Sequence, residues 1–168
     1  MPSLPRHQQG LPEPLERWRH DVALPEAFLL LNFLGEISRR VSSSYGTWLR
    51  SYSIDFSEYV VLWALRLLEP RSPSVSDLRS RVVMSSGGIA LALNRLDTKR
   101  LVRRKPSAQD GRAVIVHLTP KGRRLIDQLM VLDAERHEQL LEGLGGAERV
   151  RVLDGLAEIL QRHIALHP

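Results

Sequence analysis

Cationic side chains gather in one stretch of the chain, and cations at this density are suited to neutralising phosphates. Residues 95–124 carry ten Lys or Arg and only two acids, Asp97 and Asp110, which gives this segment a charge of +8, whereas the whole chain carries +5. A surface that binds a nucleic-acid backbone gains affinity by releasing condensed counterions. Such a surface is therefore expected to carry a local excess of positive charge like this one. A solvated basic face with no partner has the same composition, so the elements around the segment must decide between the two.

Two short helices separated by a tight break are expected just before the basic segment. The Ser-x-x-Asp pattern at residues 74–77 resembles a capping box and predicts a helix that ends near Val83. Either Ser85 or Ser86 can cap the next helix, over residues 86–99, because a hydroxyl oxygen can accept from free N–H groups of the first turn. We expect this second helix to turn three apolar residues inward: Ile89, Leu93 and Leu96.

The basic segment itself changes period after residue 101. Val114, Val116 and Leu118 alternate along the chain with Ala113, Ile115 and His117. This period of two predicts a strand. Residues 107–111 supply turn chemistry before this strand. Residues 101–118 are therefore expected to form a β-hairpin with a charged tip.

Helices are also expected before the two short ones. Apolar residues at spacings of three and four predict a long helix over residues 24–51, with Pro25 in its first turn. A second stripe predicts a helix over residues 58–68 that turns Trp63 inward. Trp48 is expected in the core as well.

The chain after the hairpin predicts two more helices. Thr119 and Pro120 form a good N-cap and first-position pair for a helix that continues through Leu144. Gly145 and Gly146 are expected to break it. A last helix over residues 147–165 carries an apolar stripe of Val152, Leu153, Leu156, Ile159, Leu160 and Ile164. The whole order is mainly α with a small β-hairpin, and it matches a winged helix-turn-helix with helices at both ends.

In a helix-turn-helix the second helix lies in the major groove with its N-terminal part against base edges. At the wing tip, Arg112 held by Asp110 is expected to enter a minor groove, although the two side chains could instead only stiffen the turn. Lys99, Arg103 and Lys105 are expected to touch phosphates or remain solvated. The candidate DNA-binding residues are Ser85, Ser86, Gly87, Ala90, Leu91, Asn94, Arg95, Arg103, Lys105, Asp110 and Arg112.

The segment SSGGIALALNRLDTKRLVRR, followed by Asp110-Gly111-Arg112 and VIVHLTPKGRRL, resembles the MarR family of bacterial transcriptional regulators. The resemblance implies a homodimer that binds double-stranded DNA and releases it when a small, often aromatic, effector binds. It implies a winged helix-turn-helix flanked by N- and C-terminal dimerisation helices. The segments are then a flexible tail (1–14), N-terminal dimerisation helices (15–56), the DNA-binding domain (57–118) and C-terminal dimerisation helices (119–168).

The Ser-Ser-Gly-Gly sequence and an N-terminal extension with Trp18 further resemble the urate-responsive PecS-like branch of that family. This resemblance implies effector contacts for Trp18 and Arg104. Val60 and Ala92 stand where the branch has an acid and an arginine, so the resemblance does not name urate as the effector.

Other classes of protein lack support in the sequence. It has no cysteine, no Walker-type phosphate loop, no Gly-x-Ser-x-Gly, no His-Glu-x-x-His and no Gly-rich dinucleotide turn, so we expect no enzyme and no cofactor. His163 and His167 lie four apart but near the chain end, and we expect no metal site. The apolar runs are too short to span a membrane and no secretory layout opens the chain, so a cytoplasmic protein is expected.

The sequence thus predicts a DNA-binding transcriptional regulator that acts as a repressor from a near-palindromic operator and is released by a small, aromatic or anionic effector. The alternative is a degenerate relative that binds DNA weakly and acts through protein partners. Leu91, an apolar residue on the recognition face, is what motivates this alternative.

Overall fold

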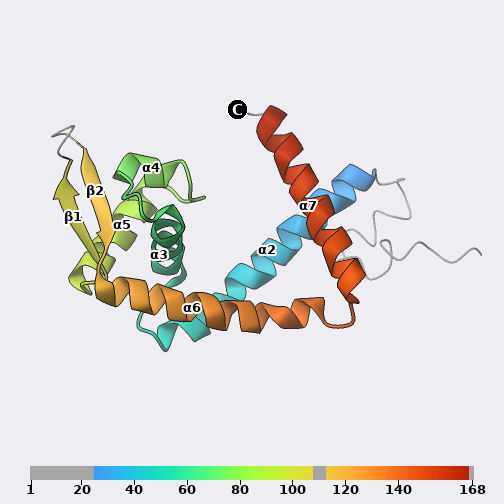
Figure 1. Cartoon of the computed structure of the whole chain (residues 1–168), viewed down its shortest axis with the longest axis horizontal. Helices are drawn as coiled ribbons and strands as arrows, with labels where there is room; N and C mark the ends of the chain where they lie inside the picture. Colours follow the sequence, from blue (N-terminus) through green and yellow to red (C-terminus); the bar gives the residue numbers. More distant parts are fainter. Residues whose placement is uncertain (1–24, 108–112, 167–168) are drawn as a thin grey trace, which may run out of the picture. The chain divides into compact units, whose positions relative to one another are not determined.

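The computed structural model describes residues 25–107 and 113–166, and Figure 1 shows how the elements follow one another. Internal contacts divide the chain into two units, residues 1–56 and 57–168. The expected tail over residues 1–14 lies outside the described residues, as do Trp18, Asp110 and Arg112.

The first unit is built on one long helix, α2, Glu26–Arg50. Pro25 occupies the N-cap position of α2, one residue earlier than the first-turn position predicted for it. Its φ of −59° suits that place. Near the other end, the ring of Tyr45 lies 4.9 Å from that of Phe56 and 5.7 Å from that of Trp48, which is half-buried.

The second unit holds the remaining elements in the predicted order, which confirms the mainly helical fold class with a small hairpin. The described residues form one two-stranded antiparallel sheet. The elements are α3, Phe56–Leu68; α4, Val75–Arg79; α5, Ser86–Thr98; β1, Val102–Pro106; β2, Val114–Leu118; α6, Pro120–Glu138; a 3₁₀ turn, Gln139–Leu141; and α7, Gly146–Leu166.

The prediction that Trp63 packs in the core is wrong. Trp63 is 41% exposed and Leu67, one turn later, is 56% exposed. Helix α3 is apolar on nearly all sides, so its sequence does not mark one stripe as the inner one. The residues that α3 buries are Glu58, Tyr59, Val61, Leu62, Ala64 and Leu65. Tyr59 also donates a hydrogen bond of 2.7 Å to Asp133 of α6.

Helix α4 is shorter than predicted. It begins at the expected capping box, in which Ser74 accepts from the Asp77 backbone N–H and the Asp77 carboxylate accepts from Ser74. The Ser74 backbone N–H, and then its hydroxyl, lower the pKa of Asp77. The helix ends at Arg79, Val82 is buried beyond it, and Val83 is fully exposed in the break before α5.

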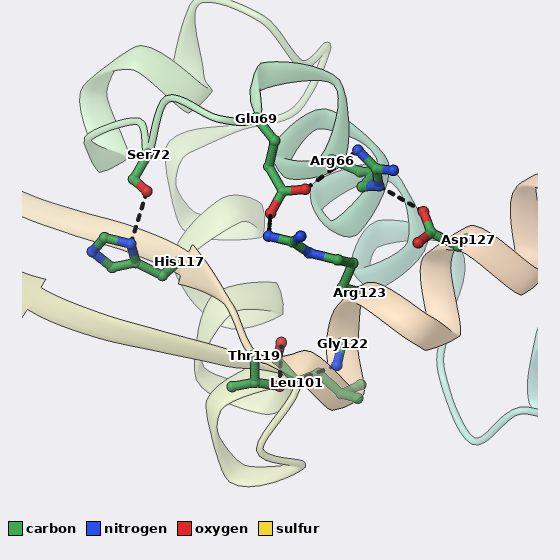
Figure 2. Close-up of polar contacts among 9 residues, drawn as sticks. All are labelled: Arg66, Glu69, Ser72, Leu101, His117, Thr119, Gly122, Arg123 and Asp127. Atoms are coloured by element: carbon green, nitrogen blue, oxygen red, sulfur yellow. Dashed lines mark hydrogen bonds and ion pairs between the residues drawn. The ribbon is translucent and has the colours of Figure 1, made fainter.

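The hairpin prediction is confirmed for the described strands. Strands β1 and β2 pair from Val102 opposite Leu118 to Pro106 opposite Val114. Val102 and Val116 are buried. The Val116 backbone N–H also donates to the carbonyl of Pro73, and the side chains of Ser72 and His117 lie 2.7 Å apart, so the chain before α4 lines the outer edge of β2 (Figure 2).

Helix α6 begins at a close junction with the start of the hairpin. Thr119 caps the helix, as predicted, by accepting from the backbone N–H of Gly122 at 3.0 Å. The Thr119 backbone N–H donates to the carbonyl oxygen of Leu101 at 3.1 Å. A Cβ at Gly122 would lie 1.9 Å from that same oxygen, so only glycine allows the helix this near (Figure 2). These contacts explain the Leu-Thr-Pro-x-Gly sequence.

The end of α6 differs from the prediction of a helix through Leu144. The helix stops at Glu138 and continues as a 3₁₀ turn. The left-handed turn after it is made by Gly143, with φ of 82°, ahead of Gly145 and Gly146, which we expected to break the helix. Helix α7 follows close to its predicted bounds, and every residue described in it is exposed or half-exposed. Within residues 25–107 and 113–166, no helix has an apolar stretch that could cross a bilayer.

Replacing Gly122 by alanine tests the junction. The added methyl group meets backbone rather than a flexible side chain, so Gly122→Ala should lower the free energy of unfolding by about 3 kcal/mol. Chemical denaturation measures it. Gly155→Ala in α7, where nothing lies within 4 Å of the new carbon, is the control and should raise stability by up to about 1 kcal/mol. Equal stabilities of Gly122→Ala and the native protein would contradict the close approach.

Candidate nucleic-acid interface

The N-terminus of α5 has a defined cap. Ser85 adopts an extended backbone and its hydroxyl oxygen accepts from the N–H of Gly88 at 3.1 Å. Of the two serines that could have capped the helix, Ser85 therefore does so. Ser86 becomes the first helical residue and its side chain stays exposed.

The two faces of α5 divide as predicted. Ile89, Leu93 and Leu96 are at most 1% exposed, and Ala92 joins them in the core. The opposite face carries the predicted outward set, all of it exposed: Ser86, Gly87, Ala90, Leu91, Asn94 and Arg95. This exposure makes the face available to a partner, and contact with DNA stays a prediction.

Lys99 does not belong to the phosphate-seeking surface. Its Nζ lies 2.5 Å from Oε1 of Glu58, a carboxylate that is only 1% exposed. A buried charge is tolerated when it has a close partner of opposite sign, and removing that partner would leave it uncompensated. Lys99 thus fastens the C-terminal end of α5 to the first turns of α3. The expectation that it touches phosphate or stays solvated is wrong.

Arg123 has an acidic partner within the protein, although its side chain is exposed. It pairs with Glu69 at 2.5 Å, and Glu69 also lies 3.3 Å from Arg66. Arg66 in turn donates to Asp127 at 2.6 Å, and this bond raises the pKa of Arg66. The four side chains join the end of α3 to the second turn of α6 (Figure 2).

Two cations on β1, unlike Lys99 and Arg123, have no acidic partner among the described residues. Arg103 and Lys105 alternate with Arg104 along the strand, so they share the face of the hairpin opposite to the one that buries Val102. Both are exposed, and neither has an acidic partner among the described residues. They are the wing cations whose charge is open to an outside anion.

Arg104 lies on the inner face of β1 and reaches α5. Its guanidinium donates to the side-chain oxygen of Asn94 at 2.7 Å. The sequence linked Arg104 to an effector together with Trp18, which is outside the described residues. The structure instead brings Arg104 together with a residue of the exposed α5 face. Its Nε is buried and has no partner within the described part of the chain.

Three exposed arginines near α4 were missed by the sequence analysis: Arg71, Arg79 and Arg81. They precede the segment on which that analysis concentrated. A signal for them was present in the sequence. They lie in or next to the first helix of the predicted helix-turn-helix, and this helix crosses the DNA backbone in such motifs.

Comparison with known proteins decides which family this arrangement belongs to. A family model described as "Transcriptional regulator SarA/Rot" matches residues 43–129, half of the chain, from the last turns of α2 to the middle of α6. The chain belongs to the SarA/Rot family of transcriptional regulators. Members of this family are regulators and not enzymes, in agreement with the sequence analysis.

Individual relatives of this SarA/Rot family member are also named as transcriptional regulators. The regulator TtmR of Methylorubrum extorquens is 32% identical over 119 residues, which cover 69% of this chain and 57% of TtmR. The chain spans less than two thirds of the length of the first curated relatives that it matches.

Solved structures share the fold. MarR of E. coli in complex with operator DNA matches with a TM-score of 0.66 at 23% identity, over 80% of this chain and 96% of MarR. BpsR of Bordetella bronchiseptica, described as regulated in its DNA binding by 6-hydroxynicotinic acid, matches with a TM-score of 0.58 at 27% identity, over 75% of this chain and 97% of BpsR. The winged helix-turn-helix fold of this SarA/Rot family member is thereby confirmed.

Gly87 offers a test of the α5 face. Nothing lies within 4 Å of a Cβ built there, so Gly87→Ala fits the free protein and should raise its stability by about 1 kcal/mol. In a complex where the α5 backbone approaches DNA at this point, the same methyl group should weaken binding about tenfold. Thermal melting and fluorescence anisotropy with labelled duplex measure the two effects.

The control for Gly87→Ala is Gly35→Ala in α2, where the new carbon also meets nothing within 4 Å. It should raise stability without changing DNA affinity. A Gly87→Ala protein that gains stability and keeps its full affinity would place the N-terminal turn of α5 away from the DNA.

Proposed function

We propose that the chain is a cytoplasmic, homodimeric repressor that binds a near-palindromic operator in double-stranded DNA and is released by a small aromatic or anionic effector. The observation that carries the proposal is that the outer face of α5 is exposed and that the wing presents two exposed cations without acidic partners among the described residues, Arg103 and Lys105. Base edges and phosphates are the two kinds of group that such a pair of surfaces can bind together. The fold shared with the MarR–operator complex supports it.

In this proposal the contacts have separate roles. The N-terminal part of α5 enters the major groove, with Ser85 and Ser86 nearest the DNA backbone. Arg103 and Lys105 neutralise phosphates and set the position of the protein without reading sequence. At the wing tip, Asp110 holds Arg112 for an adjacent minor groove. The remaining readers on α5 are Gly87, Ala90, Leu91, Asn94 and Arg95.

The homodimer is supported by α7, which buries nothing in the single chain. Six apolar residues on this helix are 37–60% exposed: Val152, Leu153, Leu156, Ile159, Leu160 and Ile164. A helix with an exposed apolar stripe of this length is stable only when the stripe is covered, and a second copy supplies a matching stripe. We assign dimerisation to residues 15–56 and 119–168. A symmetric pair then spaces two α5 helices about 34 Å apart, one turn of DNA.

Release by an effector needs a ligand that prefers a spacing of the α5 pair different from the one DNA requires. The resemblance to the PecS-like branch gives Trp18 and Arg104 as its contacts. The similarity to BpsR, whose DNA binding is described as regulated by 6-hydroxynicotinic acid, supports an aromatic acid as the class of ligand. In this proposal Arg104 would be shared between the effector and Asn94, so the effector would act directly on the α5 face.

Removing the two wing cations tests the electrostatic part of the proposal. Arg103→Ala combined with Lys105→Ala should weaken binding to all duplexes similarly and lower the slope of log affinity against log salt by about 2 for each protomer. Gel shifts on DNA from upstream of the protein's own gene, at several salt concentrations, measure this slope. Arg39→Ala combined with Arg40→Ala in α2 removes the same charge and should leave the slope unchanged. An unaltered slope in the wing variant would remove these residues from the interface.

A charge placed in the apolar stripe of α7 tests the dimer. Leu156→Asp should convert the dimer to a monomer in sedimentation velocity, because one carboxylate per subunit would be buried without a partner. Operator affinity should fall with it, since each half-site would then be bound singly. Gln161→Asp adds the same charge away from the stripe and should remain dimeric. A dimeric Leu156→Asp protein would show that α7 does not form the interface.

A further inference from the structure

The exposed face of α5 has few groups that can read a base by hydrogen bonding. Between Ser86 and Asn94, the only polar side chains are those two. Gly87 offers no side chain, and Ala90 and Leu91 occupy the middle of the face. Arg95 follows at the C-terminal margin of the face, so the middle of α5 itself offers few hydrogen-bonding groups for sequence-specific DNA binding, if binding proceeds through this face as proposed above.

The amide of Asn94 is restricted further by its bond to Arg104. Asparagine recognises adenine by using its oxygen and its NH₂ group together. Here the oxygen accepts from the Arg104 guanidinium at 2.7 Å, so the amide is oriented with its NH₂ group available to an outside acceptor. Asn94 is left as a single donor, which bases of several kinds can satisfy.

Leu91 is the large side chain of this face, and it is 51% exposed. Its neighbours Ala92 and Leu93 are buried, so the helix had apolar residues enough to pack without it. The major groove presents one apolar group on a base edge, the C5 methyl of thymine. The cations Arg103 and Lys105 on the adjacent strand make a nucleic acid, rather than an apolar protein, the complementary occupant.

We propose that Leu91, with Ala90 beside it, reads a thymine by packing against its methyl group, and that this contact is the source of sequence discrimination in the middle of α5. Asn94, oriented by Arg104, adds one donor near the same base step. The inference rests on the proposed DNA-binding function and specifies its substrate: duplexes with a thymine at the centre of each α5 footprint. A protein-binding role for Leu91 has less support, because small or polar residues surround it and the apolar patch is limited to Ala90 and Leu91 on this face.

The experiment uses the whole chain and has two stages. Selection from a randomised duplex library first gives the preferred site. Each thymine in that site is then replaced by deoxyuridine, which removes only the methyl group, and the dissociation constant is measured. At one thymine in each half-site, this replacement should weaken the binding of the protein to the duplex about fourfold. This is the contribution expected from burying one methyl group.

The variant Leu91→Ala should bind the thymine and deoxyuridine duplexes equally, because the side chain that senses the methyl group is gone. Leu67→Ala in α3 is the matched control, since Leu67 is similarly exposed at 56%, and it should keep the fourfold difference.

The outcomes separate the inference from the function on which it rests. A library from which no duplex is enriched would overturn the proposed function, and the inference with it. An enriched site that tolerates deoxyuridine at every position would overturn the inference alone. So would a Leu91→Ala protein that still distinguishes thymine from deoxyuridine.

Discussion

The carbonyl group of Leu101 is the point on which the arrangement of α5, the hairpin and α6 depends. The backbone N–H of the same residue donates to Leu96 at 2.9 Å and so closes the end of α5, while the carbonyl accepts from Thr119 at 3.1 Å. One residue thus joins the end of α5, the start of β1 and the start of α6. Arg100 before it takes a φ of 58°, a conformation that costs a non-glycine residue about 1 kcal/mol or more. The position of the wing relative to α5 is fixed by this junction and by the bond between Arg104 and Asn94.

The surplus of charge that first marks the segment 95–124 is divided between two tasks. Lys99 neutralises the buried Glu58, Arg123 pairs with Glu69, and Lys121 donates to the carbonyl of Lys99 at 3.2 Å. These cations have partners within the protein, whereas Arg103 and Lys105 have no acidic partner among the described residues. Counting charge along the chain therefore overestimates the charge that is open to an outside anion. The exposed arginines beside α4 compensate for part of the difference.

The sequence predicts the elements well where a local signal sets them. The capping residues at Ser74, Ser85 and Thr119 act within four residues of themselves, and alternation predicts β2 directly. Long-range pairs leave no such mark: Glu58 and Lys99 are 41 positions apart, and Arg104 meets Asn94 across two elements. Trp63 fails for a related reason, since a helix that is apolar on most sides does not show which side the fold will bury.

Contacts at the corner between α6 and α7 connect the proposed dimer helix to the rest of the second unit. Arg149 of α7 donates to the carbonyls of Leu144 and Leu141, at 3.1 and 3.0 Å, and pairs with Glu138 at the end of α6. The start of α7 is therefore fixed to the far end of α6, and the near end of α6 is fixed at the Leu101 junction. A helix of 19 residues is about 28 Å long and shifts as a unit. In a dimer joined through α7, a change in how the two copies meet would thus reach the wing and α5 along α6, with no need for a flexible link.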